Sequence, residues 1–304
     1  MHVLIITQYF PPEIGAAASR WGDYTNILVE QGHQVTVLCE VPNYPKGSYY
    51  KGYENTWVKK EIINSNLTII RSAAGINDRK STISKFIHYL TFMISGIFNV
   101  FKIRNFDLVI VSSPPLFTGM IGVLLNKFKS IPFWLDVRDL WPDSAIALNQ
   151  IKNNIFYYLG KKMESTIYNC SKGFIFPVPG FKDYLNNEFK LIKYKPKFLL
   201  QNGVSEKFIS LVKGTNITPN ERFTVLYSGN MGLAQGLETI IQASKLLKKY
   251  PIDFQFIGDG IERNKLEDLV EKNGQKNIFF YDSMNRSELI KWIKRSSVCL
   301  VPLK

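Results

Sequence analysis

Cysteine and histidine are scarce in this sequence, which contains three of each in 304 residues. The cysteines Cys39, Cys170 and Cys299 are far apart, and the histidines form no recognisable pair. This spacing does not suit a zinc site, whereas it fits buried thiols in a reducing compartment. We therefore expect neither a metal centre nor a disulfide framework.

The N-terminal stretch lacks the features of a secretory signal. Met1–Thr7 has no basic region and no small-residue cleavage site, and its apolar run is typical of a first β-strand. These features predict a cytoplasmic protein.

Acidic residues are few relative to basic ones. The chain has 38 lysines and arginines against 25 aspartates and glutamates, which gives a formal net charge of +13. Such an excess indicates a nucleic acid, an anionic membrane surface or a phosphorylated substrate as partner, unless it reflects only a lysine-rich proteome. Since no repeated basic and aromatic motif is present, a nucleic acid is the least suitable of these partners.

One apolar stretch, Phe86–Phe101, carries no formal charge when His88 is neutral, and basic residues flank it. It is shorter than the about 20 apolar residues of a comfortable bilayer span. Two interpretations remain open: a buried helix, or a helix that lies in the membrane interface with its basic flanks on the headgroups. The residues that would contact the membrane are Lys85, Phe86, Phe92, Phe98, Lys102 and Arg104; the family resemblance given below implies a lipid-linked acceptor for the same residues.

The first 204 residues predict a doubly wound α/β domain. Hydrophobic residues make up 45% and charged residues 21% of the chain, as in globular proteins. Val3–Ile6 is typical of a buried parallel strand, Ala16–Gln31 of a helix, and Gln34–Cys39 of the next strand. This order places the loop that ends at Gly15 at the carboxyl end of the first strand, where open α/β sheets bind ligands. Val41–Asn66 has no clear period and predicts a long surface loop.

Charged residues gather where another predicted strand, Pro132–Val137, ends. Asp136, Arg138 and Asp139 follow one another closely there, with Asp143 four residues further on. Such residues are unlikely choices for core packing, so they indicate a site, although a helix N-cap at Asp139 or Asp143 is an ordinary alternative.

The second half opens with strand formers that stop at Gly229, followed by Gly232, Gly236 and a helical pattern. A strand that turns through glycines into a helix exposes backbone N–H groups at the positive end of the helix dipole. The turn therefore suits a phosphate or diphosphate, or it is a plain glycine-rich connection, because its spacing is not that of a dinucleotide-binding motif. A second glycine pair, Gly258-Asp259-Gly260, follows the next predicted strand.

The composition divides the chain into three parts. Residues 1–204 form the predicted N-terminal domain, and residues 205–222 are predicted to be a linker. Residues 223–304 form the predicted C-terminal domain, whose about 80 residues after the linker fall short of a usual domain of about 100–200. The family resemblance described next implies acceptor binding by the first domain and nucleotide-sugar binding by the second.

Five short motifs occur in the order found in family 4 glycosyltransferases, and the resemblance extends over nearly the whole chain. These motifs are Tyr9–Gly15, Asp139–Ser144, Asn202–Val204, Tyr227–Gly236 and Gly258–Gly260. The sequence resembles in particular the bacterial branch that transfers N-acetylated amino sugars such as N-acetyl-fucosamine in O-antigen and capsule assembly. The resemblance implies the α/β GT-B fold, with two Rossmann-like domains facing a cleft and the second domain incomplete.

The resemblance also implies a reaction. A sugar would pass with retention from a nucleoside diphosphate, expected to be UDP, to a polyprenyl-diphosphate-linked saccharide at the inner face of the plasma membrane, without a metal or other cofactor. Gly15, Gly229, Asn230, Gln235, Gly258 and Asp259 would bind the donor and its diphosphate. Asp136, Arg138 and Asp139 would orient the sugar or the acceptor. The donor sugar, the acceptor and the linkage do not follow from the motifs.

The sequence departs from the family pattern in two ways. Many members carry an arginine and a lysine at the positions of Asn230 and Gln235, so backbone amides would have to hold the diphosphate here unless Arg138 or Lys304 contributes. The Glu-x7-Glu motif that binds the donor is absent, which suggests a truncated chain. A non-catalytic remnant and a GT-B-shaped sugar-nucleotide 2-epimerase are therefore the alternative functions.

Overall fold

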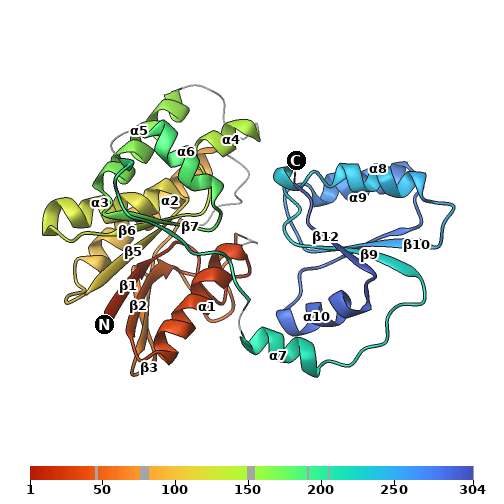
Figure 1. Ribbon diagram of the computed structural model, residues 1–304, viewed down its shortest axis with the longest axis horizontal. Helices are drawn as coiled ribbons and strands as arrows, with labels where there is room; N and C mark the ends of the chain where they lie inside the picture. Colours follow the sequence, from red (N-terminus) through yellow and green to blue (C-terminus); the bar gives the residue numbers. More distant parts are fainter. Residues whose placement is uncertain (45–46, 76–81, 149–154, 190–191, 205, 304) are drawn as a thin grey trace. The chain divides into compact units, whose positions relative to one another are not determined.

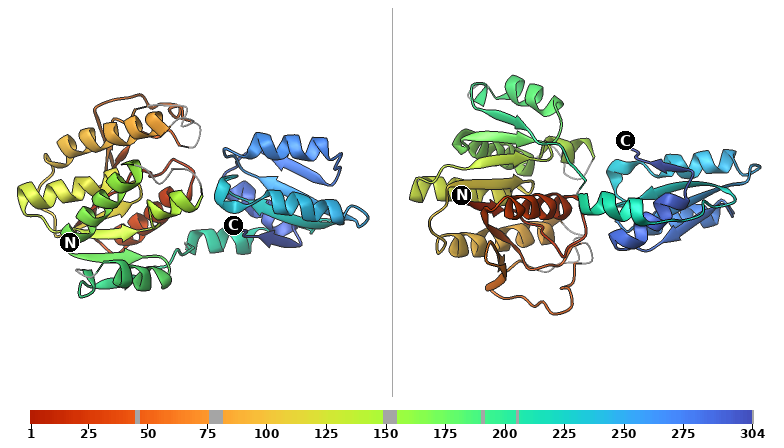
Figure 2. Two further views of the ribbon diagram at one scale, coloured as in Figure 1. Left: turned by 90° about the horizontal axis from the view of Figure 1, so that it is seen from above. Right: turned by 60° about the horizontal axis from the view of Figure 1, so that its bottom comes forward.

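The structure is a computed structural model that describes residues 1–44, 47–75, 82–148, 155–189, 192–204 and 206–303. It contains two compact units, Met1–Gly203 and Val204–Lys304, which we call unit 1 and unit 2. Each unit consists of helices packed on a largely parallel sheet, as Figures 1 and 2 show.

Within the described residues, the sheet of unit 1 has eight strands in the order β3-β4-β2-β1-β5-β6-β7-β8. Only β3 and β4 pair antiparallel; all other neighbours in this sheet are parallel. The strands are β1 (His2–Ile6), β2 (Gln34–Glu40), β3 (Val58–Asn64), β4 (Leu67–Ser72), β5 (Leu108–Ser113), β6 (Trp134–Val137), β7 (Gly173–Phe176) and β8 (Lys197–Leu199). The helices are α1 (Ala16–Glu30), α2 (Thr82–Val100), α3 (Leu116–Lys129), α4 (Asp143–Ala147), α5 (Ile155–Cys170) and α6 (Gly180–Glu188).

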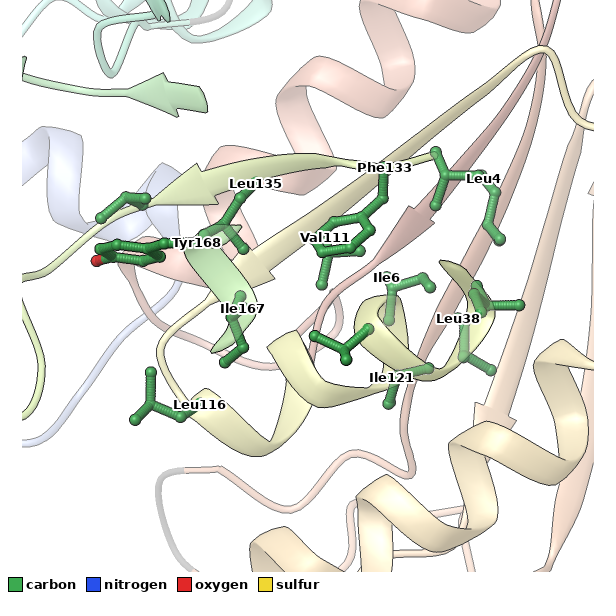
Figure 3. Packing of buried hydrophobic residues seen from close by; sticks show 14 of the residues in the cluster. Leu4, Ile6, Leu38, Val111, Leu116, Ile121, Phe133, Leu135, Ile167 and Tyr168 are labelled. Atoms are coloured by element: carbon green, nitrogen blue, oxygen red, sulfur yellow. The ribbon is translucent and has the colours of Figure 1, made fainter. Parts of the chain in front are cut away.

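The continuous apolar run of β1 is explained by burial on both faces of the sheet. Leu4 and Ile6 join one core cluster with residues of α2, α3 and α5, whereas Val3 and Ile5 join a second cluster with residues of α1. Figure 3 shows the first cluster, in which Ile121 of α3 and Ile167 of α5 meet side chains of the central strands. Since successive side chains in a strand point to opposite faces, a strand covered on both sides must be apolar throughout.

The segment predicted as a long loop, Val41–Asn66, contains the strand β3. The expectation of a loop was therefore wrong for Val58–Asn64. Among the described residues β3 is an edge strand paired with β4, and most of its side chains are exposed. Neither face of such a strand needs to be apolar, so the alternation that reveals a half-buried strand is missing.

Helix α2 has both a packed face and an exposed face. Phe92, Ser95 and Val100 are buried against the rest of unit 1, whereas Ile87 and Phe98 are exposed. Phe92 was expected to contact the membrane or the acceptor; instead its side chain is 0% exposed and belongs to the main core. On length and composition alone, Ile83–Val100 could cross a membrane, but a third of this window, 33%, is buried within the protein.

Unit 2 has a parallel sheet with the order β11-β10-β9-β12 in the part of the chain that is described. Its strands are β9 (Phe223–Ser228), β10 (Ile252–Ile257), β11 (Ile278–Tyr281) and β12 (Val298–Leu300). Its helices are α7 (Glu206–Gly214), the short 3-10 helix η2 (Leu233–Gln235), α8 (Glu238–Leu246), α9 (Arg263–Lys272) and α10 (Arg286–Arg295). The core lies between the sheet and the helices α8 and α9, and α10 packs near β9 and α7.

The predicted linker, residues 205–222, contains helix α7 and differs in this respect from the expectation. This helix packs against α10, and the Lys294 ammonium donates a hydrogen bond to the Thr215 carbonyl (2.6 Å) that follows it. The Arg286 guanidinium lies over the Phe208 ring at 5.9 Å from its centroid.

The three thiols differ in exposure, although all three were expected to be buried. Cys39 is buried in β2, Cys170 is partly buried, and Cys299 is exposed on the edge strand β12. Burial raises the pKa of the Cys39 thiol to about 12.

Candidate functional site

The strand order of each unit places its predicted motifs at a topological switch point. In unit 1 the chain leaves β1 toward β2 on one side and reaches β5 on the other. In unit 2 the strand β9 has β10 on one side and β12 on the other. Open α/β sheets bind ligands outside the carboxyl ends of strands at such points. The loop to Gly15 follows β1, and the turn through Gly229 follows β9, so both loops stand where ligands bind in this class of fold.

In unit 1, Asp136 at the end of β6 is completely buried and both of its oxygens are occupied. The Arg20 guanidinium lies 2.9 Å from one oxygen, and the Ser112 hydroxyl donates a hydrogen bond of 2.9 Å to the other. Arg20 also donates to the Leu200 carbonyl (2.9 Å) and to the Asn202 side chain (2.7 Å). In this geometry Asp136 ties α1 to the strand ends, and its carboxylate is not free to orient a sugar as the sequence predicted.

Arg138 is held by the same group of residues. Its Nε donates to the Ser112 hydroxyl (2.8 Å), its Nη2 donates to the Pro114 carbonyl, and the Asp136 carboxylate lies 4.0 Å away. Burial lowers the pKa of the Arg138 guanidinium, and the charge of Asp136 partly offsets this effect. The side chain is therefore fixed at the carboxyl edge of the sheet with 17% of its surface exposed.

Asp139 is exposed and orders the turn that leads to α4. Its carboxylate accepts hydrogen bonds from the Leu140 amide (2.8 Å) and the Ser144 hydroxyl (3.1 Å). Because α4 begins at Asp143, these hydrogen bonds order the backbone just before the helix. They resemble helix capping, which was the alternative to a site role for this residue.

The Gly15 loop is joined to the loop after β2. Gly15 precedes α1, and a Cβ atom on it would lie 3.2 Å from the Tyr44 ring. The carboxylate of Glu13 accepts hydrogen bonds from the Phe10 amide (3.1 Å), the Asn43 amide (3.0 Å) and the Tyr44 amide (2.9 Å). One buried carboxylate thus connects two loops at the carboxyl edge.

A second buried carboxylate lies in the same region. Glu40 accepts hydrogen bonds from the side-chain amide groups of Gln8 (2.7 Å) and Asn43 (2.9 Å), and the His88 ring on α2 lies 3.1 Å from it. Burial, together with the charge of Glu40, raises the pKa of Glu13 from its ordinary value of 4.5 to about 8. The sequence motifs do not single out Glu13, Glu40 or Arg20, because their partners are distant in the chain. A carboxylate inside an apolar and proline-rich run was the signal for Glu13.

Asp143, the last aspartate of the charged stretch after β6, lies in another group of polar residues at the start of α4. It accepts hydrogen bonds from Tyr157 (2.9 Å), Lys161 (3.0 Å) and Tyr184. Burial would raise its pKa, but these three hydrogen bonds outweigh burial and lower it. Lys161 also pairs with Glu164 (2.6 Å), a buried carboxyl whose pKa burial raises to about 7.

In unit 2 the loops after β9 and β10 pack backbone against backbone. Gly258 has a φ of 140°, and a Cβ atom on it would lie 1.9 Å from the Gly229 carbonyl oxygen. The Gly229 amide donates to the Ile257 carbonyl (2.9 Å), and the Met231 amide donates to the Asp259 carbonyl (2.8 Å). No side chain fits at Gly258, so the two predicted donor loops form one rigid structure.

Polar groups of these two loops form hydrogen bonds within the loops themselves. Gln235 accepts a hydrogen bond from the Gly232 amide (3.2 Å), the Tyr227 hydroxyl donates to the Asn230 carbonyl (2.6 Å), and the Asp259 carboxylate accepts from the Gly260 amide (2.8 Å). The turn then leads into α8, which has Glu238 in its first turn. Lys304, one cation considered for the diphosphate, lies outside the described residues.

The predicted membrane-contacting residues other than Phe92 lie at the two ends of α2. Phe86 and Phe98 are exposed on the helix, Lys102 and Arg104 are exposed just after it, and Lys85 is partly buried. The Phe98 ring lies 5.9 Å from the ring of Trp57, which precedes β3.

Residues 212–304, which include the glycine turn of unit 2, match the family model described as glycosyl transferases group 1. A relative with 23% identity is the putative colanic acid biosynthesis glycosyl transferase WcaI of Escherichia coli (strain K12); the match covers 100% of this chain and 77% of the relative.

Two solved structures show the fold. Sucrose-phosphate synthase from Thermosynechococcus elongatus superposes with a TM-score of 0.74 at 16% identity, covering 100% of this chain and 75% of the other. An Escherichia coli protein titled trehalose-6-phosphate, bound with UDP-2-fluoro glucose, gives 0.69 at 14% identity, covering 100% and 79%. The chain therefore has the GT-B fold. Because residues 212–304 match glycosyl transferases group 1, the protein is a transferase.

Proposed function

We propose that this protein transfers a sugar from a UDP-sugar to a polyprenyl-diphosphate-linked saccharide during the assembly of a surface polysaccharide. The glycine turn Gly229–Gly236 at the end of β9 carries this proposal, because it lies inside the matched region and at the switch point of its sheet. The relative named for colanic acid biosynthesis supports the polysaccharide context, and the neighbour bound with UDP-2-fluoro glucose supports a UDP-sugar donor.

The chemistry of transfer assigns a task to this turn. The bond between the anomeric carbon and the diphosphate oxygen breaks, a bond to an acceptor hydroxyl oxygen forms, and the nucleoside diphosphate leaves with the bonding electron pair. Preorganised N–H groups at the start of a helix stabilise the negative charge that develops on the leaving group. We assign this task to the turn that starts at Gly229 and Asn230 and leads to α8, with Gly258 and Asp259 as the supporting loop; the Gly229 amide itself donates to the Ile257 carbonyl and holds the turn in place.

Unit 1 is proposed to hold the acceptor. The Gly15 loop, Arg138 and the exposed Asp139 stand at the carboxyl edge of its sheet, and Arg138 supplies a fixed cation for an acceptor phosphate. Asp136 acts here through its contacts with Arg20 and Ser112. The exposed face of α2 with Phe86 and Phe98, together with Lys102 and Arg104 just after the helix, is proposed to rest on the inner surface of the plasma membrane.

The finer assignment is an N-acetylated amino sugar, transferred with retention of anomeric configuration. This assignment depends on the motif resemblance alone. NMR analysis of the anomeric configuration of the product, made from a panel of UDP-sugars, tests both parts of it.

Donor binding is the first test, measured by titration calorimetry with UDP-sugars. The Gly258→Ala variant should lose binding at least about tenfold, because a Cβ atom would overlap the Gly229 carbonyl oxygen. Gly214→Ala is the matched control, since nothing lies within 4 Å of its added Cβ atom. Absence of binding to every UDP-sugar by the unmodified chain would exclude the transferase proposal and leave the non-catalytic alternative.

The 2-epimerase alternative is tested with the same material. An epimerase would convert a UDP-N-acetylamino sugar to its 2-epimer without any acceptor, whereas the proposed enzyme would consume the donor only when a lipid-linked saccharide is present. Chromatography of the nucleotide sugars after incubation distinguishes the two reactions.

A further inference from the structure

Unit 1 contains a cavity of about 460 Å³ beside the edge strand β3 of its sheet. His2 and Gln34, the first residues of β1 and β2, line it together with residues of β3, β4 and the C-terminal end of α2. The lining reaches Val58, which pairs with Ser72 at the carboxyl end of β4, but it includes no residue of the Gly15 loop or of Asp136–Asp139. The proposed sugar transfer makes no use of this cavity.

The charge of the cavity is positive. Lys60 of β3 and Lys102, just after α2, line it, and no carboxylate is among its lining residues. Both lysines are exposed, and neither has an ion-pair partner among the residues that the structure describes. Two cations beside neutral polar groups, without a counter-ion, favour an anionic ligand.

A buried amide in the wall has an unused acceptor. The Nδ2 atom of Asn99 donates to the Trp57 carbonyl (2.8 Å) and to the Ser72 hydroxyl (2.9 Å), whereas its buried Oδ1 atom has no hydrogen-bond partner within the described chain. Asn99 is 2% exposed. Since buried polar atoms are normally paired, this oxygen indicates a ligand with a hydroxyl donor.

Apolar side chains adjoin the cavity on the outside. Trp57 and Phe98 precede the lining residues Val58 and Asn99, and they are 50% and 57% exposed. Their rings lie 5.9 Å apart, and Phe98 continues an exposed apolar stripe along α2 that also contains Ile83, Ile87 and Ile94. The ligand that suits this combination has an anionic, hydroxyl-bearing head and an apolar body.

We propose that this cavity binds the headgroup of an anionic phospholipid. Lys60 and Lys102 would contact the phosphate, the Asn99 oxygen would accept a headgroup hydroxyl, and Trp57 and Phe98 would enter the acyl layer. The cavity would thereby fix the orientation of α2 on the membrane. This inference deepens the membrane contact of the proposed function, but lipid binding can be measured without any sugar transfer.

Sedimentation with vesicles tests the site, using vesicles of phosphatidylglycerol mixed with phosphatidylcholine and vesicles of phosphatidylcholine alone. Removing both lysines in K60Q/K102Q should weaken binding to the anionic vesicles about thirtyfold, from the typical contribution of a lysine near such a surface. The control is K248Q/K249Q in unit 2, which removes the same charge from two exposed positions. Equal loss in both variants would mean that only net charge matters and would overturn the proposal.

Tryptophan fluorescence provides a second readout. Lipids brominated in their acyl chains should quench part of the emission of the bound protein, and Trp57→Phe should remove that part. Unchanged quenching in Trp57→Phe would overturn the placement of this side chain in the acyl layer.

Soluble glycerophosphate separates a lipid site from a site for free phosphate esters. Lysine-dependent binding of glycerophosphate without vesicle binding would overturn the lipid assignment. Calorimetry of K60Q/K102Q with the UDP-sugar should match the unmodified protein, so failure of the lipid site and failure of the transferase proposal remain distinguishable.

Discussion

At the scale of single residues, the buried acids of unit 1 do more to organise the candidate site than the exposed ones. Asp136 holds Arg20 and the ends of several strands, and Glu13 connects the loops after β1 and β2. A buried ion pair contributes little net stability, but removal of one partner leaves an uncompensated charge. The Asp136–Arg20 pair and the hydrogen bonds of Glu13 therefore fix the positions of the loops.

The protonation of Glu13 should make stability depend on pH. Its pKa is about 8 in the folded protein and 4.5 ordinarily, so the folded state binds the additional proton between these values. The contribution of this proton to the free energy of unfolding is fully present below about pH 4.5 and is lost as the pH rises through 8. Between these values the free energy of unfolding falls by at most about 1.4 kcal/mol per pH unit. Glu13→Gln should flatten this dependence in urea unfolding between pH 5 and 8, whatever its effect on absolute stability.

A control is needed because Glu164, whose pKa is raised to about 7, contributes in the same direction. Glu164→Gln should remove only its own part of the slope, up to about pH 7. An unchanged slope in Glu13→Gln would contradict the assignment of the proton to this cluster.

At the scale of elements, α2 is an amphipathic helix on the surface of unit 1. Phe92→Ala should destabilise the protein by about 3–5 kcal/mol, because this ring is completely buried in the main core. Phe98→Ala, six residues further along the same helix, should change stability by less than about 1 kcal/mol, because more than half of the Phe98 side chain is exposed. Chemical denaturation of the two variants measures the difference, and similar losses would mean that the helix packs in another orientation.

Buried parallel strands and the glycine turns were predictable from the sequence because their patterns are local. Val3–Ile6 had to be apolar on both faces, and Gly258 had to accept a positive φ beside another backbone. The edge strand β3 was not predictable, and the sequence left open whether α2 is buried, since each depends on neighbours distant in the chain. The same reason applies to Asp136, which becomes a buried partner only when Arg20, 116 positions away, reaches it.

At the scale of the whole molecule, each unit has its own hydrophobic core, and the core of unit 2 draws on residues of that unit alone. Calorimetric unfolding should therefore show two transitions. A UDP-sugar at about 100 times its dissociation constant should stabilise the transition of unit 2 by about 2.7 kcal/mol and leave that of unit 1 unchanged. A single transition that moves as a whole would show instead that the units unfold cooperatively.

The exposed thiol of Cys299 gives the protein a natural attachment point for a fluorescent label. Maleimides react with accessible thiolates, so they should modify Cys299 on β12 ahead of the partly buried Cys170, while the Cys39 thiol, with its pKa near 12, stays protonated and shielded. A dye at Cys299 would stand in the sheet that carries the glycine turn, where its emission could follow nucleotide-sugar binding in real time. No cysteine would have to be introduced for such an assay.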